Sequence, residues 1–200
     1  LEGTEAALLF PSGMNALFAA LLGVLSAGDE MIMLNPAYRQ TKVLADTILA
    51  RFGIVTKFLF HRDEKKFITD LQKAITPRCK IILIEMPSNP HLYLVDFAAV
   101  KKLCPADTLL VADASFATPL HFRAHDWGAD LIIHSGTKYL SGHGDCLIGG
   151  LSGRKDIVDA LRVQRDVIGA MPSPDNAFLL QRGFASLALR MARHNETALA

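Results

Sequence analysis

The residues best suited to chemistry lie in one stretch, 130–145, with the sequence DLIIHSGTKYLSGHGD. Its apolar run, residues 131–133, has the length and β-branched content of a buried strand. The turn that follows presents hydroxyl groups beside Lys138, and Gly142 and Gly144 then let the backbone bend away. A lysine at the end of a buried strand can hold a carbonyl cofactor as a Schiff base once it has lost its proton, which partial burial favours. The stretch predicts such a site at Lys138, with an ordinary surface lysine as the alternative.

Polar residues also follow three other apolar runs. Tyr38 comes after residues 30–34, Asn89 after 80–85, and Asp113 after 108–112. In an open parallel sheet, ligands bind outside the carboxyl ends of the strands. These side chains and the turn at 135–138 are therefore expected to meet in one pocket. Each residue also has a purely structural interpretation. Tyr38 could be an interfacial aromatic, Asn89 part of an ordinary turn, and Asp113 a carboxylate that braces a loop.

A helix is predicted to begin near Gly13, in the segment PSGMN at residues 11–15. The first turn of a helix offers unpaired N–H groups and the positive end of the helix dipole, which suits a phosphate group. The segment is also an ordinary helix N-cap, and it matches neither of the common glycine-rich nucleotide loops.

The order of elements indicates the fold class. Strands are expected at residues 30–34, 54–60, 80–85, 108–112, 131–134 and 147–152. They alternate with helices at 40–52, 64–75 and 97–103 and with helices that begin near residues 13, 155 and 176. Such alternation predicts an α/β domain with a mostly parallel sheet and helices on both faces. Residues 6–28 carry no charge, but Pro11 interrupts the run, so we expect a buried helix there rather than a membrane span.

Composition narrows the function classes. The chain is 50% hydrophobic and 20% charged with a net charge of +1, which is typical of a soluble α/β protein and gives no sign of nucleic-acid or membrane partners. Cys79, Cys104 and Cys146 are expected to be buried free thiols in a reducing compartment, hence a cytoplasmic location. His134 and His143 flank the lysine without the spacing of a metal site, so we interpret both as structural and predict no metal.

Residues 135–140, SGTKYL, followed by Gly142 and His143, resemble the cofactor-lysine motif of the pyridoxal-phosphate enzymes of cysteine and methionine metabolism. That family includes cystathionine γ-synthase, cystathionine lyases, methionine γ-lyase and O-acetylhomoserine sulfhydrylase. The resemblance runs through essentially the whole chain. It implies pyridoxal 5'-phosphate as cofactor and the large domain of the aspartate-aminotransferase-like fold, fold type I, over residues 1–200.

The resemblance also implies roles for particular residues. Lys138 would hold the cofactor aldehyde and move the substrate's α-proton, and Asp113 would pair with the pyridine nitrogen. Tyr38 would stack on the ring and assist proton transfer, while Asn89 would contact the ring hydroxyl or the substrate. The family usually has threonine two residues after the acid; here Ser115 keeps a hydroxyl at that position.

The phosphate group of the cofactor would be bound by neutral donors. The resemblance implies the N–H groups of Gly13 and Met14, with the hydroxyls of Ser135 and Thr137. A dianion bound only by such donors requires a cation. The substrate carboxylate likewise requires a donor such as arginine, for which Arg39 is the only local candidate. We therefore expect residues 1–200 to be part of a longer protein. It would be a homodimer or homotetramer whose active site takes cations from a second subunit and from a C-terminal small domain.

Residues 38–41, YRQT, look most like the cystathionine γ-synthases, whereas methionine γ-lyases tend to carry a cysteine where this chain has Gln40. The reaction predicted first is γ-replacement, in which the thiol of cysteine displaces the acyloxy leaving group of an O-acylhomoserine. The alternatives are a lyase that splits a C–S bond, an O-acetylhomoserine sulfhydrylase, and a binding domain without catalysis.

Overall fold

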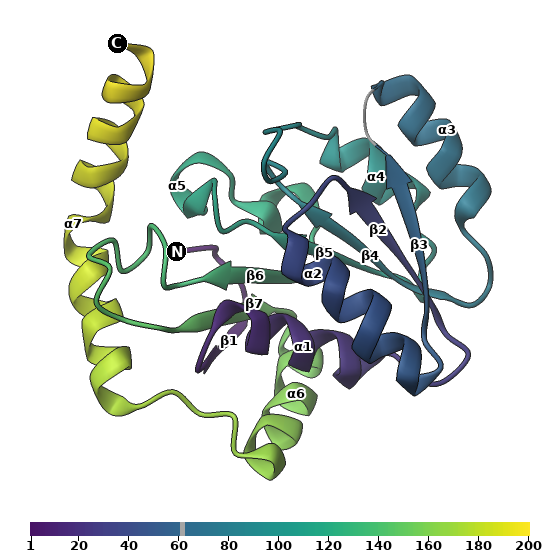
Figure 1. Ribbon diagram of the computed structural model, residues 1–200, viewed down its shortest axis with the longest axis horizontal. Coiled ribbons are helices and arrows are strands. Elements are labelled where there is room, and N and C mark those ends of the chain that lie inside the picture. The colour runs from purple at the N-terminus through teal and green to yellow at the C-terminus, as the bar shows by residue number, and fades with distance from the viewer. Residues whose placement is uncertain (61–62) are drawn as a thin grey trace.

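The computed structural model describes residues 1–60 and 63–200. They form a seven-stranded sheet in the order β1-β7-β6-β5-β4-β2-β3 (Figure 1). Strands β6, β5, β4, β2 and β3 are parallel neighbours, whereas β7 is antiparallel to both β6 and β1. The predicted mostly parallel α/β fold is confirmed. The strands are β1 (Ala6–Phe10), β2 (Glu30–Asn35), β3 (Val55–Phe60), β4 (Cys79–Glu85), β5 (Leu109–Asp113), β6 (Leu131–Ser135) and β7 (Gly149–Gly153).

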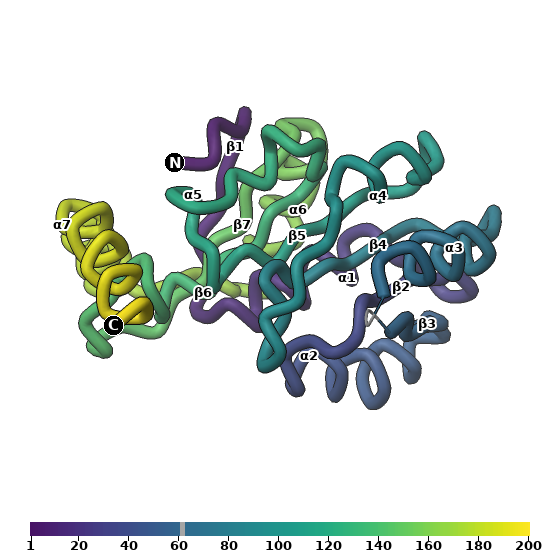
Figure 2. The backbone as a smooth tube through the Cα atoms, turned by 90° about the horizontal axis from the view of Figure 1, so that it is seen from above, coloured from purple at the N-terminus to yellow at the C-terminus, as the bar shows by residue number. Residues whose placement is uncertain are grey.

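Helices cover both faces of the sheet, which explains why the central strands are apolar almost throughout. Met31 and Met33 of β2 pack with α1 and α6, whereas the alternate residues Ile32 and Leu34 pack on the other face with α3 and α4. Helix α7 lies at the end of the molecule opposite α3 (Figure 2). The helices are α1 (Gly13–Val24), α2 (Arg39–Val43), α3 (Glu64–Ala74), α4 (Phe97–Leu103), α5 (Thr118–His121), α6 (Lys155–Ile168) and α7 (Pro174–Leu199).

The uncharged run 6–28 contains the buried helix expected after Pro11, and also a strand that the sequence did not predict. Its first part is strand β1, which pairs with β7 from Ala6 opposite Gly153 to Phe10 opposite Gly149. Only the part after Pro11 and Ser12 is helical, as α1. Five apolar residues have no diagnostic period, so the strand becomes recognisable only through its distant partner. Among the described helices, none is long and apolar enough to cross a membrane.

Three smaller differences concern local structure. The helix expected at 40–52 is continuous but changes pitch, from α2 through a π turn at Leu44–Ile48 to a 3₁₀ turn at Leu49–Phe52. Short helix α5 and the 3₁₀ turn at Ala124–Trp127 were not predicted. Cys104 is only partly buried, unlike Cys79, although all three cysteines are free thiols as expected.

Candidate active site

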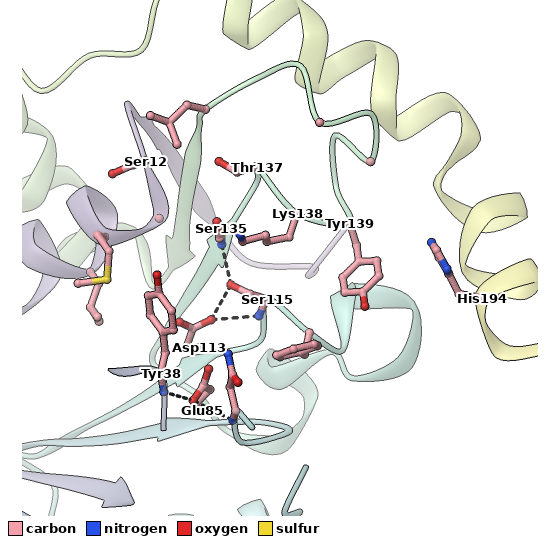
Figure 3. A pocket seen from close by; sticks show the side chains of 18 residues that line it. Ser12, Tyr38, Glu85, Asp113, Ser115, Ser135, Thr137, Lys138, Tyr139 and His194 are labelled. Carbon is pink, nitrogen blue, oxygen red and sulfur yellow. Dashed lines mark hydrogen bonds between the residues drawn. The ribbon is translucent and has the colours of Figure 1, made fainter. Parts of the chain in front are cut away.

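A cavity of about 610 Å³ opens at the carboxyl edge of the sheet (Figure 3). It lies where β2, β4, β5 and β6 end and where α1 begins, because parallel strands deliver their carboxyl ends to the same edge. The structure brings together all nine predicted site residues as part of its lining: Gly13, Met14, Tyr38, Asn89, Asp113, Ser115, Ser135, Thr137 and Lys138.

The start of α1 has the features of an anion seat. The Ser12 side chain caps the helix by accepting the N–H of Asn15 at 3.1 Å. The N–H groups of Gly13 and Met14 donate to no described residue. A Cβ atom on Gly13 would lie 2.8 Å from Cβ of Ser135, so only glycine allows the helix to start this close to β6. Two backbone donors and the helix dipole thus face the cavity beside a serine.

Asp113 ends β5 and is held by Ser115. The Ser115 hydroxyl donates to Oδ1 of Asp113 at 2.6 Å, and the Ser115 N–H donates to the same oxygen at 3.0 Å. The same hydroxyl accepts the N–H of Ser135 at 2.6 Å, which links β5 to β6. Burial raises the pKa of Asp113, and the bonds from Ser115 oppose that rise. Ser115 therefore fixes the direction of the carboxyl group, and a hydroxyl residue is needed to do so.

Lys138 lies in the turn after β6 and lines the cavity, but it is exposed rather than partly buried as the sequence predicted. Gly136 and Leu140 of the same turn are buried, so the exposure belongs to Lys138 itself, at the open cavity. Gly142 and Gly144 adopt left-handed φ angles of 71° and 69°, which confirms the bend expected there. The Thr137 hydroxyl donates to the carbonyl of Ile148 at 3.2 Å, so this predicted phosphate donor already has a partner.

Arg190 of α7 clamps this turn, and sequence reasoning missed it. Its guanidinium donates to the carbonyl oxygens of Tyr139 at 2.7 Å and Leu140 at 3.3 Å. It also donates to the carbonyl of Gly183 at 2.9 Å and to the hydroxyl of Ser186 at 3.0 Å within its own helix. Loss of hydration lowers the pKa of Arg190. No local pattern marks an arginine that binds a turn 50 residues earlier in the chain.

Glu85 is the second residue that sequence reasoning missed. It is the last residue of β4, lines the cavity, and lies directly opposite Asp113 in the register of β4 and β5. Its Oε2 atom accepts the N–H groups of Tyr38 at 2.6 Å and Asn89 at 3.2 Å. Burial, and next the charge of Asp113, raise the pKa of Glu85 to about 7. A polar residue at the end of an apolar run is the signal that the sequence offers, but the same pattern also marks the end of an ordinary strand.

The two histidines beside the lysine contact protein groups. Nε2 of His134 lies 2.7 Å from Oε1 of Glu2, and both side chains are buried. Nδ1 of His143 lies 2.5 Å from the carbonyl of Ser141. Within residues 1–60 and 63–200, no group of three or more metal-ligating side chains comes together.

Aromatic side chains form one wall of the cavity. Phe116 and Tyr139 lie 6.2 Å apart between ring centroids, and Tyr139 meets His194 of α7 edge-on at 5.4 Å. Among the described lining residues, only Lys138 and His194 can carry a positive charge. Arg39, the one arginine considered from the sequence, is not part of the lining.

Fold and cavity together define an α/β domain with a ligand site at the sheet edge, and comparison with known proteins identifies its family. Residues 1–200 match the family described as Cys/Met metabolism PLP-dependent enzyme. The chain belongs to this family.

Among its relatives, L-methionine gamma-lyase of Pseudomonas deceptionensis is 40% identical over 99% of this chain and 50% of its own length. The chloroplastic cystathionine gamma-synthase 1 of Nicotiana tabacum is 38% identical over 100% of this chain and 36% of its own. The crystal structure of metB from Corynebacterium glutamicum superposes with a TM-score of 0.89 at 32% identity, covering 94% of this chain and 48% of that one. The chain thus has the fold of the fold type I PLP enzymes and spans half or less of the length of these relatives.

The donor set fits pyridoxal phosphate, the cofactor of the family. At Gly13 there is no room for a Cβ atom. The N–H groups of Gly13 and Met14, which donate to no described residue, suit a phosphate. A carboxylate at Asp113 suits the ring nitrogen, and Lys138 offers an amine to the aldehyde in the same cavity.

Proposed function

We propose that this chain forms the pyridoxal-phosphate-binding part of an enzyme that transforms a sulfur amino acid or an activated homoserine. Cystathionine γ-synthase activity is the first candidate. The observation that carries the proposal is the convergence of Lys138, Asp113 and the start of α1 on one cavity. A binding domain without catalysis would not require an amine and a carboxylate in the same cavity.

Pyridoxal phosphate, when bound, supplies a ring that takes up negative charge from the substrate's α-carbon. Lys138 Nζ would hold the cofactor through its aldehyde and, once displaced by the substrate amine, accept the α-proton and later return it. Asp113, oriented by Ser115, would keep a proton on the ring nitrogen. Tyr38 would cover one face of the ring and assist proton transfer, and Asn89 would donate to the ring hydroxyl or contact the substrate.

The phosphate oxygens would accept hydrogen bonds from the N–H groups of Gly13 and Met14 and from the hydroxyl of Ser135. Thr137 would first have to release the carbonyl of Ile148. All these donors are neutral, and a helix dipole contributes only about half a charge. We therefore propose that a second subunit of a homodimer or homotetramer, and segments outside residues 1–200, supply the cations for the phosphate and the substrate carboxylate. Activity that survives dilution into a monomeric state would contradict this.

The reaction itself has two candidates. Gln40 in the first turn of α2 and its neighbours favour a γ-synthase, in which the sulfur of cysteine bonds to the γ-carbon of an O-acylhomoserine and the acyloxy group leaves as a carboxylate. A C–S lyase is the second candidate, because relatives of up to 40% identity include methionine gamma-lyases. We propose a reducing compartment such as the cytoplasm, which is supported by the three free cysteines.

Two experiments on the intact protein test the proposal. Borohydride reduction of the pyridoxal-phosphate-loaded protein followed by peptide mapping should label Lys138, and a label on Lys42, Lys80 or Lys155 would refute the assignment. Steady-state assays with O-succinylhomoserine or O-acetylhomoserine plus cysteine should yield cystathionine. Thiol release from cystathionine or methionine would instead favour the lyase. A loaded protein that turns over none of these substrates would support the binding domain.

A further inference from the structure

One carboxyl oxygen joins two loops of the cavity. Oε2 of Glu85 accepts the N–H of Tyr38, which lies 47 residues away in the loop after β2. It also accepts the N–H of Asn89, in the loop after its own strand β4. A carboxyl group can accept these hydrogen bonds whether or not it carries its proton. Glu85 therefore ties both loops to the rigid edge of the sheet.

The two anchored residues are the ones whose side chains would contact the ring of the cofactor. Tyr38 is 41% exposed and precedes α2 as an N-cap without a side-chain hydrogen bond. In both residues the anchored N–H group adjoins the Cα atom that carries the side chain, so moving this N–H moves the side chain. Positioning of this kind matters because a displacement of about 1 Å at a reacting centre can cost a hundredfold in rate.

We propose that Glu85 is a positioning residue that sets where Tyr38 and Asn89 lie in the cavity, an inference that rests on the proposed function. The required property is a hydrogen-bond acceptor at the position of Oε2. Its partners are backbone groups, so no substitution of Tyr38 or Asn89 other than by proline would remove the donors. A role in folding alone is the competing explanation, and a suitable control separates the two.

Glu64 is that control. Its Oε1 atom accepts the N–H of Asp96 at 3.1 Å, so it also ties a distant loop, yet it does not line the cavity. The test compares Glu85→Ala, Glu85→Gln and Glu64→Ala in the intact protein. Three properties are measured for each: the melting temperature, the dissociation constant for pyridoxal phosphate and the visible circular dichroism of the bound cofactor.

We expect Glu85→Ala to weaken pyridoxal-phosphate binding by about tenfold or more and to change the visible circular dichroism. Glu85→Gln, whose amide oxygen can accept both N–H groups, should restore both properties to within about threefold of the parent. Glu64→Ala should alter only the melting temperature. If Glu85→Ala fails to fold, Glu85→Asp replaces it, because its shortened carboxylate cannot keep both bonds and should change both cofactor readouts.

Two results would overturn the inference: parental cofactor readouts in the folded Ala or Asp variant, or equal changes in the Glu85 and Glu64 variants. Cofactor binding by the parent protein distinguishes a wrong role for Glu85 from a wrong proposed function. If the parent does not bind pyridoxal phosphate at Lys138, the proposed function fails and the role of Glu85 with it. If the parent binds it there and the Glu85 variants behave like the parent, only the role of Glu85 is wrong.

Discussion

Replacing Gly13 by alanine tests the phosphate seat most directly. The added Cβ would lie 2.8 Å from Cβ and 2.9 Å from Cα of Ser135. Non-bonded carbon atoms rest roughly 3.5 Å or more apart, so the start of α1 and the end of β6 must separate by about 0.7 Å. A backbone atom cannot rotate out of the way. Overpacking costs about 1–3 kcal/mol, which the better helix propensity of alanine offsets by up to about 1 kcal/mol. We expect a net destabilisation of about 1–2 kcal/mol.

The same displacement should weaken cofactor binding. A hydrogen bond of about 2.9 Å stretched by about 0.7 Å is lost, and one bond to a charged acceptor contributes about 1.5–3 kcal/mol. The dissociation constant for pyridoxal phosphate should therefore rise by roughly tenfold to a hundredfold. Urea denaturation and cofactor titration of the cofactor-free protein measure the two effects. Gly150→Ala on β7, where no heavy atom lies within 4 Å of the added Cβ, is the control and should change stability by less than about 0.5 kcal/mol. Parental affinity in a folded Gly13→Ala variant would refute the proposed seat.

Three further predictions concern charged groups. Asp113→Asn should retain most cofactor binding but lower kcat by about a hundredfold or more, because a neutral amide does not hold a proton on the ring nitrogen; parental turnover would exclude that pairing. Arg190→Ala should destabilise the protein by about 1–3 kcal/mol and speed hydrogen exchange in the turn that carries Lys138, since two carbonyl groups lose their donor. The control Arg193→Ala removes only an exposed ion pair with Glu196, so it should change neither the stability nor the exchange rate. Equal effects of the two substitutions would argue that Arg190 does not hold the turn. Finally, burial raises the pKa of Glu85 from 4.5 to about 7, so the folded protein holds a proton that the unfolded chain releases in this window. The free energy of unfolding of the cofactor-free protein should therefore fall by up to roughly 3 kcal/mol as the pH rises through this window. The Glu85→Gln variant should lose most of this pH dependence, and an unchanged dependence would contradict the raised pKa of Glu85.

The sequence by itself determined the fold class and the place of the cavity. Apolar runs of strand length alternated with helical segments, and this order alone favours a parallel sheet. Because the strands are parallel, the residues that directly follow each strand lie at the same carboxyl edge of the sheet. Tyr38, Asn89, Asp113 and Lys138 therefore line one cavity, as predicted. These inferences succeeded because each depends on residues that are neighbours in the chain.

Only the tertiary structure decided the contacts between distant segments. Strand β1 became recognisable through its pairing with β7. Glu85 gained its role from the N–H of Tyr38, 47 residues earlier, and Arg190 from carbonyl groups about 50 residues earlier. A carboxylate at the end of a strand and an arginine in a long helix look the same in sequence whether or not such a partner exists. Hydrogen bonds depend on separations of tenths of an ångström, and the packing of the whole chain sets those separations.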